Sequence, residues 1–433
     1  MIIYDNIHGY IKVDAIASNI IDTPVFQRLR NIHQTGVLYL VYPTSNHSRF
    51  EHSIGTYHLA KQMITNISIK QPELNITDEI ILLVSIAGLC HDLGHLLFSH
   101  LFDDNFLPRL SNYNELSEKT PNVHHENRSI VLLNYLVDKY KINLNKHQLK
   151  VIADLIYPKK AEYNKWKPNY MVGKWIFQII SNPINSIDVD KFDYLIRDTK
   201  AVGLKFSFDY SRLINDAKVI TSNNKQNICY SMQCSEDIYH MFFLRYRLHR
   251  QIYNDKAVKA IEILILKLLF EIEKEYNISN YILDPEKMIK LDDMFIWRYN
   301  MSQGSFENTL INNIFEQLNT RQIPQLVFQD ISLNRIEIDE VKLKEKFNSS
   351  SFEIIRFMVG YIGGKSNPLN HITFYDLNTN TIIPQKKVRD FSLLLNQKHQ
   401  EHFLRVYCTD LTLLEDFKNY FDILNYESSD NVE

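Results

Sequence analysis

Along most of the chain, apolar side chains recur every three or four positions, which is the spacing of helices that bury one face. Residues 48–67 carry one such stripe. Thr77 and Asp78 are suitable caps for a more continuous apolar run at 80–90. The same spacing predicts a helical segment at 15–30 with a stop and restart at 22–24, and further helices at 125–140, 147–157, 186–200, 235–256 and 257–275. We therefore expect a mainly helical chain up to its C-terminal quarter.

Toward the C-terminus the pattern changes to short β-rich runs separated by turns. These runs are 326–331, 354–362, 371–376 and 403–407, with a turn at 363–368. Earlier, 217–220 and 228–233 flank a polar stretch and predict a β-hairpin. The expected fold class is mainly α, with a helical core at 1–320, a smaller C-terminal α+β lobe at 321–426 and a disordered tail at 427–433.

Composition places the chain among ordinary globular proteins, because 45% of its residues are apolar and 23% are charged. The formal net charge of −3 gives no overall field for nucleic acid or an anionic membrane, so neither is an expected partner. The four cysteines lack the paired spacing of a zinc site or a disulfide framework, which predicts reduced thiols and an intracellular location, cytoplasmic or nuclear. The N-terminus lacks the pattern of a signal peptide, and the longest apolar runs, 80–90 and 261–270, are too short to span a bilayer.

The central apolar run ends in a cluster of residues able to bind a metal. His91 and Asp92 are adjacent, His95 lies one helical turn after His91, and His100 follows a break at Gly94. An adjacent histidine and aspartate offer a nitrogen and an oxygen to one point, which suits a divalent cation. A single histidine there would more often be a core residue bonded to a backbone carbonyl. Three histidines and one aspartate within ten residues favour a metal site.

Three other segments hold candidate ligands, and each has a structural alternative. His52 comes early on a predicted helix, where an exposed histidine would be ordinary. His125 and Glu126 begin another helix, where a carboxylate suits the positive helix end and capping is the alternative. The Asp-rich run 187–198 would usually be a solvated face, but its interleaved apolar residues leave little room for a fully exposed helix. Ten of the sixteen histidines precede residue 126, a clustering that the rest of the chain does not share.

Together these segments resemble a known family. The H…HD…D signature of HD-domain phosphohydrolases is matched by Arg49-Phe-Glu-His52, His91-Asp92 and Asp188-Val-Asp190-Lys-Phe-Asp. The helical core is therefore expected to be an HD-domain phosphohydrolase core.

The flanking residues are similar to one branch of that family, the deoxynucleoside triphosphate triphosphohydrolases. The similarity is strongest to the vertebrate branch, which carries a sterile alpha motif ahead of its HD domain, and we expect no such extra domain here. Its main segments are 22–30, 88–95 and 98–100. The similarity runs from Tyr4 to about Lys256 and returns at 367–375 and 405–408.

This resemblance implies a metal centre made of His52, His91, Asp92 and Asp190. Two imidazoles and two carboxylates leave coordination positions open, as a catalytic site requires. Such a set accepts Fe, Mn, Zn or Mg. We expect one divalent ion to be tightly bound and Mg²⁺ to arrive with the substrate.

The resemblance also implies roles in the reaction. His95 and His125 would lie around the phosphates. His100 would be the general acid that protonates the departing 5′ oxygen, oriented by Asp103 and Glu126. In the family, the bond broken lies between the α-phosphorus and that oxygen.

Further residues are implied to bind the substrate. Those for the triphosphate are Arg49, Lys191, Tyr194 and Arg245, although each basic residue taken alone would more often form a surface ion pair. Those for the sugar are Gln34 and Asp198 on the 3′ hydroxyl, and Tyr253 where a 2′ hydroxyl would lie. The chain departs from the family at Thr35 and Asn254, where an apolar residue and a glutamine are expected.

An activator site between subunits is implied as well, for GTP or a dNTP. Its guanine-reading positions are matched by Asp22, Gln27 and Arg30, and its phosphate positions by Arg212 and Lys256. Other positions of that site differ and read Met1, Tyr4, Ser231, Gln233 and Asp237. Asp22 and Arg30 have a structural alternative as a helix-end pair. We expect a homo-oligomer, a dimer or a tetramer.

The leading functional hypothesis is metal-dependent hydrolysis of deoxynucleoside triphosphates to deoxynucleoside and inorganic triphosphate, which lowers the dNTP pool. One alternative is an HD-type phosphohydrolase that acts on other nucleotides. Another is a nucleotide-sensing oligomer with vestigial catalysis.

Overall fold

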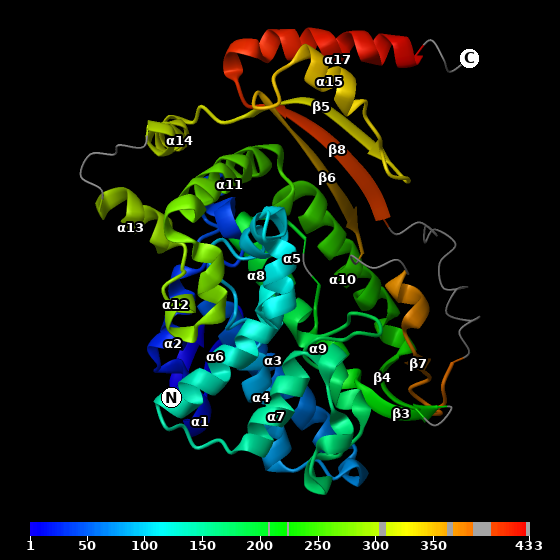
Figure 1. Cartoon of the computed structure of the whole chain (residues 1–433). Helices are drawn as coiled ribbons and strands as arrows, with labels where there is room; N and C mark the ends of the chain where they lie inside the picture. Colours follow the sequence, from blue (N-terminus) through cyan, green and yellow to red (C-terminus); the bar gives the residue numbers. More distant parts are fainter. Residues whose placement is uncertain (207, 223–224, 303–308, 362–366, 384–399, 430–433) are drawn as a thin grey trace. The chain divides into compact units, whose positions relative to one another are not determined.

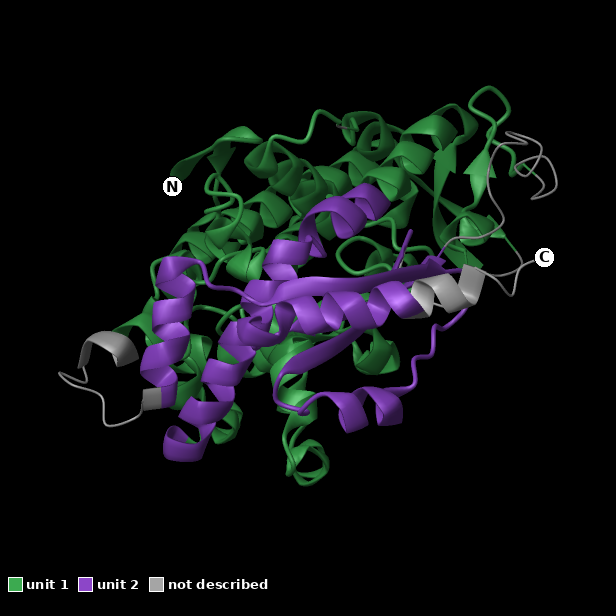
Figure 2. Ribbon diagram, turned by 90° about the horizontal axis from the view of Figure 1, so that it is seen from above, with its two compact units in different colours: residues 1–244, 277–302, 366–395 green, residues 245–276, 303–365, 396–433 purple. Residues whose placement is uncertain are grey.

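The computed structural model is mainly helical, which confirms the expected fold class (Figure 1). It describes residues 1–206, 208–222, 225–302, 309–361, 367–383 and 400–429. The chain forms two compact units, each built from non-contiguous stretches (Figure 2). The first unit comprises 1–244, 277–302 and 366–395, and the second comprises 245–276, 303–365 and 396–433. The domain boundary near residue 320 stays a prediction.

The first unit holds most of the helices. Those described are α1 (Ala15–Ile21), α2 (Pro24–Gln27), α3 (Arg49–Lys70), α4 (Asp78–Cys90), α5 (Tyr113–Lys119), α6 (His125–Lys139), α7 (Lys146–Ile156), α8 (Val189–Val202), α9 (Ser211–Asp216), α12 (Pro285–Met288), α13 (Met294–Ser302) and the first part of α10 (Ser235–Leu248). Helix α3 packs against α4 and α8, and α4 also packs against α7.

Local sequence explains where the central helices begin and end. A capping box of Ser48 and Glu51 starts α3, and the Thr77 side chain accepts a hydrogen bond from Ile80 N at the start of α4. Asp188 caps α8, which ends at Gly203 in the left-handed conformation. The predicted apolar stripe of α3 is buried. These three helices therefore present their first or last turns to one region of the unit.

Two small sheets complete the first unit. Strands β1 (Ile2–Asp5) and β2 (Gly9–Lys12) form an N-terminal hairpin. The hairpin predicted further along the chain is confirmed by β3 (Lys218–Ser222) and β4 (Lys225–Ser231), whose tip residues 223–224 lie outside the described part. The short strand β7 (Phe374–Tyr375) pairs in parallel with β4.

The second unit is a three-stranded antiparallel sheet with helices. Its elements are the end of α10, α11 (Lys256–Tyr276), α14 (Thr309–Thr320), β5 (Gln325–Ser332), α15 (Glu340–Lys346), β6 (Phe352–Gly360), β8 (Gln400–Cys408) and α17 (Leu414–Ser429), with strand order β5-β8-β6. Successive side chains of β8 point to opposite faces of the sheet, as in any β-strand. Leu404 and Val406 pack with Phe417 of α17, whereas Tyr407 packs against Ala260 of α11.

Three details differ from the expected elements or fall outside them. The helix expected at 235–256 ends at Leu248 and continues as a π-helical turn. Helix α17 runs to Ser429, through the first residues of the tail expected to be disordered, and 430–433 lie outside the described residues. Residues 363–366 of the expected turn also lie outside them.

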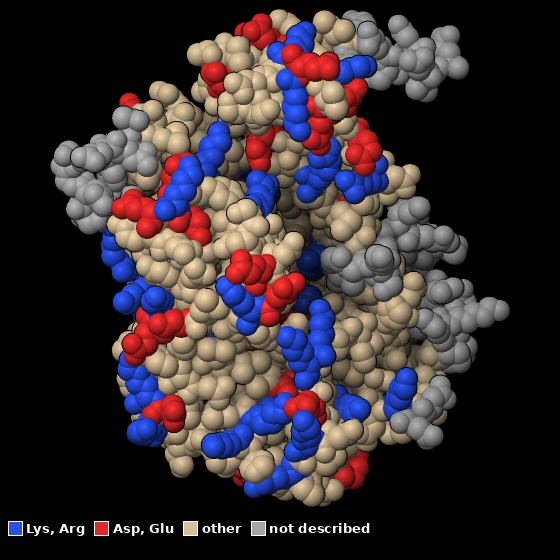
Figure 3. All heavy atoms as spheres, viewed as in Figure 1, with Lys and Arg blue, Asp and Glu red and all other residues tan. Residues whose placement is uncertain are grey.

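No helix of the described part is long and apolar enough to cross a membrane. On the face drawn in Figure 3, basic and acidic side chains are mixed, in keeping with the small net charge.

Candidate active site

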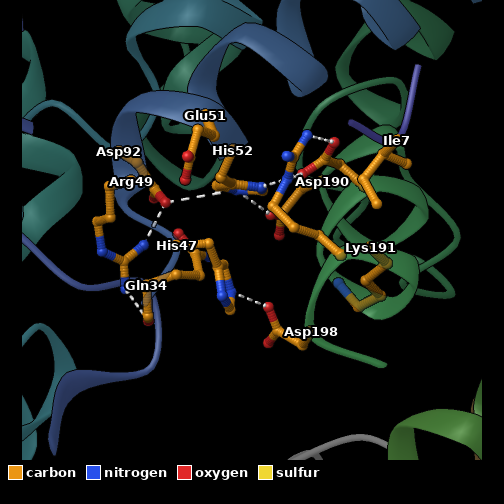
Figure 4. A network of polar contacts seen from close by, with 12 residues as sticks. Ile7, Gln34, His47, Arg49, Glu51, His52, Asp92, Asp190, Lys191 and Asp198 are labelled. Atoms are coloured by element: carbon orange, nitrogen blue, oxygen red, sulfur yellow. Dashed lines mark hydrogen bonds and ion pairs between the residues drawn. The ribbon is translucent and has the colours of Figure 1, made fainter. Parts of the chain in front are cut away.

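Four metal-type side chains from three segments converge in the first unit, and Figure 4 labels three of them, His52, Asp92 and Asp190. His52 comes from the first turn of α3, His91 and Asp92 follow the last turn of α4, and Asp190 lies in the first turn of α8. His52 Nε2 lies 3.3 Å from His91 Nε2 and 3.1 Å from Asp190 Oδ1. Asp92 Oδ2 lies 3.5 Å from His52 Nε2. Two imidazoles and two carboxylates at this spacing are the donor set of a divalent transition metal, so the residues present fit such an ion.

Backbone contacts orient His91 toward this group. His91 Nδ1 lies 2.8 Å from the Gly88 carbonyl, so that nitrogen donates and leaves Nε2 facing His52. Ser129 of α6 donates to the His91 carbonyl at 2.6 Å. Gly94 allows α6 to come this close, because a Cβ there would lie 2.2 Å from the His125 carbonyl oxygen. The turn after α4 is thus fixed by α6.

The charges of the group are strongly coupled. Burial opposes protonation of His52, but its hydrogen bonds to Asp190 and Asp193 outweigh burial and raise the pKa of His52 to about 10. Burial also opposes protonation of His91, and the Asp92 charge raises its pKa nonetheless. Burial opposes ionisation of Asp92 and Asp190, but Arg49 lowers the pKa of the first and His52 lowers the pKa of the second. Without a metal, both carboxylates are therefore ionised and the histidines tend to hold protons.

Asp193 is the outer partner of His52, and the sequence reasoning missed it. Its Oδ2 lies 2.8 Å from His52 Nδ1, and its Oδ1 lies 2.6 Å from His8 Nε2. Arg197 donates to both oxygens, at 2.9 and 2.8 Å. Asp193 is fully buried. The available signal was its place three residues after Asp190, since metal-binding histidines usually donate their second nitrogen to a carboxylate.

A second group of possible ligands adjoins the first through Asp92. Asp92 Oδ1 lies 3.5 Å from His95 Nε2, and the rings of His95 and His125 stack with centroids 4.0 Å apart. Burial and the Arg49 charge hold the pKa of His95 well below its usual range. Burial opposes protonation of His125, yet its hydrogen bond to Asp103 raises its pKa. One stacked ring is thus neutral and the other favours the cationic form.

Asp103, expected to orient His100, lies beside Arg128 and His125. The buried Arg128 donates to Asp103 Oδ1 at 2.5 Å, and Asp103 Oδ2 lies 3.3 Å from His125 Nδ1. His100 is exposed, and its Nδ1 lies 3.4 Å from Asp104. Asp103 and Asp104 both lie in a π-helical turn, Leu101–Phe106.

Glu126, the other residue expected beside His100, lies next to His125, with Oε2 3.8 Å from His125 Nδ1. The rings of His100 and His125 have centroids 5.8 Å apart. Asp103 and Glu126, the two residues expected to orient His100, therefore lie 3.3 and 3.8 Å from His125 Nδ1.

The loop that carries His95 and His100 has a strained backbone. Phe98 and Ser99 both have positive φ, 54° and 57°, which costs energy for residues other than glycine. The buried Asp293 accepts from Phe98 N at 2.5 Å. Ser99 Oγ accepts from Arg49 Nε at 2.9 Å. These contacts from distant segments hold the loop against its strain.

The expected phosphate-binding residues are distributed over both units. In the first unit, Arg49 donates to Asp92, Lys191 Nζ lies 3.2 Å from Asp188 and Tyr194 is half-buried on α8. Arg245 lies in the second unit, where it donates to the Gly360 and Tyr361 carbonyls.

The expected sugar-binding residues are likewise found in both units. Asp198 of α8 is buried with its Oδ1 2.7 Å from His47 Nε2, and Gln34 N donates to the His47 carbonyl at 3.1 Å. The Thr35 hydroxyl lies 3.1 Å from Ser45 Oγ. Tyr253 and Asn254 belong to the second unit, where Asn254 Nδ2 donates to the His249 carbonyl.

Three of the expected activator residues lie in the short stretch from the end of α1 to the turn after α2. Asp22 is exposed, and Arg30 Nε donates to Gln27 Oε1 at 2.7 Å. Arg212 donates to Gln233 at 3.0 Å in the same unit, and Lys256 begins α11 in the second unit.

Comparison with known proteins identifies the family of the chain. A model of the HD domain matches residues 49–198. A protein of Acanthamoeba polyphaga mimivirus, named putative HD domain-containing protein L394, is 33% identical over 97% of this chain and 95% of its own length. The deoxynucleoside triphosphate triphosphohydrolase SAMHD1 of Danio rerio is 32% identical over 96% of this chain and 72% of its own. SAMHD1 of Homo sapiens is 32% identical over 94% and 70%. The chain therefore belongs to the HD-domain phosphohydrolases and is related over almost its whole length to the SAMHD1 enzymes.

Proposed function

We propose that this protein hydrolyses deoxynucleoside triphosphates to deoxynucleoside and inorganic triphosphate and so lowers the dNTP pool. The proposal rests on one observation, the position of Asp92 between two groups of possible metal ligands. This carboxylate lies between a metal-type group with His52, His91 and Asp190 and a second group with His95. Relatives that are triphosphohydrolases by name support the choice of substrate.

His52, His91, Asp92 and Asp190 would hold a divalent ion. When bound, such an ion lowers the pKa of a water and neutralises charge on phosphate oxygens. The ion would be Fe, Mn, Zn or Mg, since this donor set does not choose among them.

The second group would act on the phosphate and the leaving group. His125, whose pKa Asp103 raises, would place positive charge beside the α-phosphate, with the neutral His95 next to it. His100 would donate a proton to O5′ as the bond between O5′ and the α-phosphorus breaks and water supplies the new oxygen. Its exposure allows a reprotonation by solvent after each turnover.

The remaining residues would bind the rest of the nucleotide. Three cationic side chains and one phenol would bind the triphosphate: Arg49, Lys191, Arg245 and Tyr194. For the sugar, Gln34 and Asp198 would bind the 3′ hydroxyl and Tyr253 would lie where a 2′ hydroxyl would go, followed by Asn254 in place of a glutamine. Thr35, whose hydroxyl already lies near Ser45, replaces an apolar neighbour of the sugar.

Product analysis tests this function. The purified protein is incubated with each dNTP and each rNTP, with and without GTP, and products are separated by chromatography. We expect deoxynucleoside and triphosphate from the wild type, and neither from His91→Ala or Asp92→Ala. Monophosphate or diphosphate products would instead support an HD phosphohydrolase for other nucleotides. Nucleotide binding without turnover would support a sensing oligomer.

A further inference from the structure

The loop before α3 holds a buried histidine that connects the two sugar-binding candidates. His47 Nε2 lies 2.7 Å from Asp198 Oδ1, with side chains only 8% and 3% exposed. The His47 carbonyl accepts from Gln34 N at 3.1 Å. Asp198 is 151 residues away from His47. One residue therefore touches both candidates, through its side chain on one side and its backbone on the other (Figure 4).

The loop itself is fixed at several points. Thr44 Oγ1 donates to the Ala201 carbonyl near the end of α8, at 2.5 Å. Arg49 N donates to the Ile32 carbonyl at 2.9 Å. His33 and Ser48 form an isolated antiparallel bridge. The loop is thus clamped between α8 and the segment that carries Gln34, which leaves the His47 ring little freedom to turn.

Gln34 and His47 each have one buried polar atom without a hydrogen-bond partner among the described residues. These atoms are Gln34 Oε1 and His47 Nδ1, which are shielded from solvent. Buried polar atoms of native proteins are almost always paired, so such atoms indicate a place where a ligand or a water supplies the bond. A carboxylate has about four acceptor positions, so Asp198 can accept from His47 and from a hydroxyl together.

We propose that His47 is a positioning residue of a 3′-hydroxyl subsite. Its Nε2–H fixes the Asp198 carboxylate, and its carbonyl fixes Gln34, so that the hydroxyl meets both at once. The ionised carboxylate only accepts, which makes Nε2 the donor of this hydrogen bond. The proposal rests on the proposed function. It adds a residue that positions the two sugar-binding side chains and has no part in binding the phosphates.

The test compares substrates that differ only at this hydroxyl. Values of kcat/KM are measured for the four dNTPs and for the matching 2′,3′-dideoxynucleoside triphosphates. We expect His47→Ala to lower kcat/KM for dNTPs by about tenfold or more, and for dideoxynucleotides by less than about threefold, because the lost interaction needs the hydroxyl. A general loss of structure would lower both equally, so the ratio separates positioning from folding.

Two further variants guard against misfolding of the alanine variant. His47→Asn keeps a polar side chain but places its nitrogen near the Nδ1 position, so it should lose dNTP preference as alanine does. His47→Gln reaches the Nε2 position and should restore it to within about threefold of wild type. The exposed His147→Ala serves as a matched control and should leave both substrates unchanged.

The outcomes of these experiments distinguish a failure of the proposed function from a failure of the proposal for His47. A wild type that turns over no dNTP defeats the proposed function and this inference with it. A wild type that hydrolyses dNTPs but does not prefer them over dideoxynucleotides defeats only the inference. Equal losses on both substrates in His47→Ala and His47→Asn, or a glutamine variant no better than asparagine, also defeat it alone.

Discussion

At the scale of single residues, the metal-type group depends on Asp193. Each of its oxygens serves a different histidine, His52 and His8, and Arg197 bonds to both oxygens. Arg197 in turn donates to Asp5 on the N-terminal hairpin at 2.9 Å. A carboxylate behind a histidine fixes the tautomer and direction of the nitrogen that faces a metal. The hairpin is thereby joined to the metal group through buried charges.

Replacing Asp193 tests this dependence. In Asp193→Asn the side chain keeps its size but loses the charge that orients His52 and pairs with Arg197. We expect metal affinity to fall by about 10- to 100-fold, as for other partners behind metal-binding histidines. Affinity is measured by competition with a chelator, using Mn²⁺ or Co²⁺.

The control removes a carboxylate from another buried network. Asp154 accepts from Trp166 Nε1 at 2.9 Å and pairs with Lys150, away from the metal-type residues. Asp154→Asn should lower the free energy of unfolding but leave metal affinity unchanged. Equal metal affinities in Asp193→Asn and wild type would refute the role given to Asp193.

The raised pKa of His52 leads to a prediction about protons. A pKa of about 10 in the metal-free protein means that His52 is protonated from acidic pH up to about pH 10, and metal binding must displace that proton. Asp92 and Asp190 have lowered pKa values and release none. Metal affinity should therefore rise with pH between 7 and 9, by up to about tenfold per pH unit for each proton released.

Calorimetry in buffers of different ionisation enthalpy counts these protons. We expect about one or more protons released per ion at pH 7.5. The same raised pKa also stabilises the metal-free fold: this contribution is complete below the unfolded value near 6.5 and is lost as pH rises through about 10. Metal binding without proton release, at constant affinity from pH 7 to 9, would contradict the charge state assigned to His52.

At the scale of elements, the site requires α3 and α8 to pack closely. Gly55 lies one turn after His52 on α3, and a Cβ there would lie 1.9 Å from Asp193 Oδ1 and 2.6 Å from an Arg197 nitrogen. Both of those atoms belong to the buried ion pair between Asp193 and Arg197. The absence of a side chain at this position therefore makes room for the charges behind His52.

Gly55→Ala should consequently destabilise the protein by about 1–3 kcal/mol, as overpacking does, despite the higher helix propensity of alanine. The same variant should bind metal more weakly, because the ion pair must shift. Chemical denaturation measures the first effect, and chelator competition measures the second.

Gly88→Ala in α4 is the matched control for Gly55→Ala. A Cβ at Gly88 would meet Ala60 Cβ and the Thr56 carbonyl oxygen at 3.0 Å, a milder conflict with the same gain in propensity. Gly88→Ala should therefore cost less stability than Gly55→Ala. If Gly55→Ala were at least as stable as Gly88→Ala and bound metal normally, the packing argument would fail.

Local patterns predicted these elements better than the contacts between them. The apolar stripe of α3 and the strand runs of the second unit follow from side-chain period alone, and the ligand-bearing segments stand out by residue type. His47 and Asp293 carry no such mark, because each acts on a residue more than a hundred positions away, Asp198 and Phe98. The ion pair between Asp103 and the buried Arg128 also has no local signature, because its two residues are 25 positions apart.

At the scale of the whole molecule, residues expected for one nucleotide come from both compact units. Asp198 belongs to the first unit, and Arg245, Tyr253 and Asn254 belong to the second. The HD-domain match at 49–198 lies within the first unit. Regulation by an activator nucleotide is a separate question, because its expected residues lie apart from the metal ligands along the chain.

Arg30 allows that regulation to be tested. Its guanidinium lies 3.6 Å from the centroid of the Phe50 ring and donates to Gln27, so two contacts hold this exposed residue in place. If GTP binds there and joins subunits, GTP should raise both dNTP turnover and molar mass measured by light scattering, and Arg30→Ala should abolish both effects while metal content stays normal. Arg335→Ala, which removes an exposed arginine paired with Glu337, should change neither effect. If GTP changes neither the turnover nor the mass of the wild type, the activator role of Asp22, Gln27 and Arg30 is refuted, and the contact between Arg30 and Gln27 is then only structural.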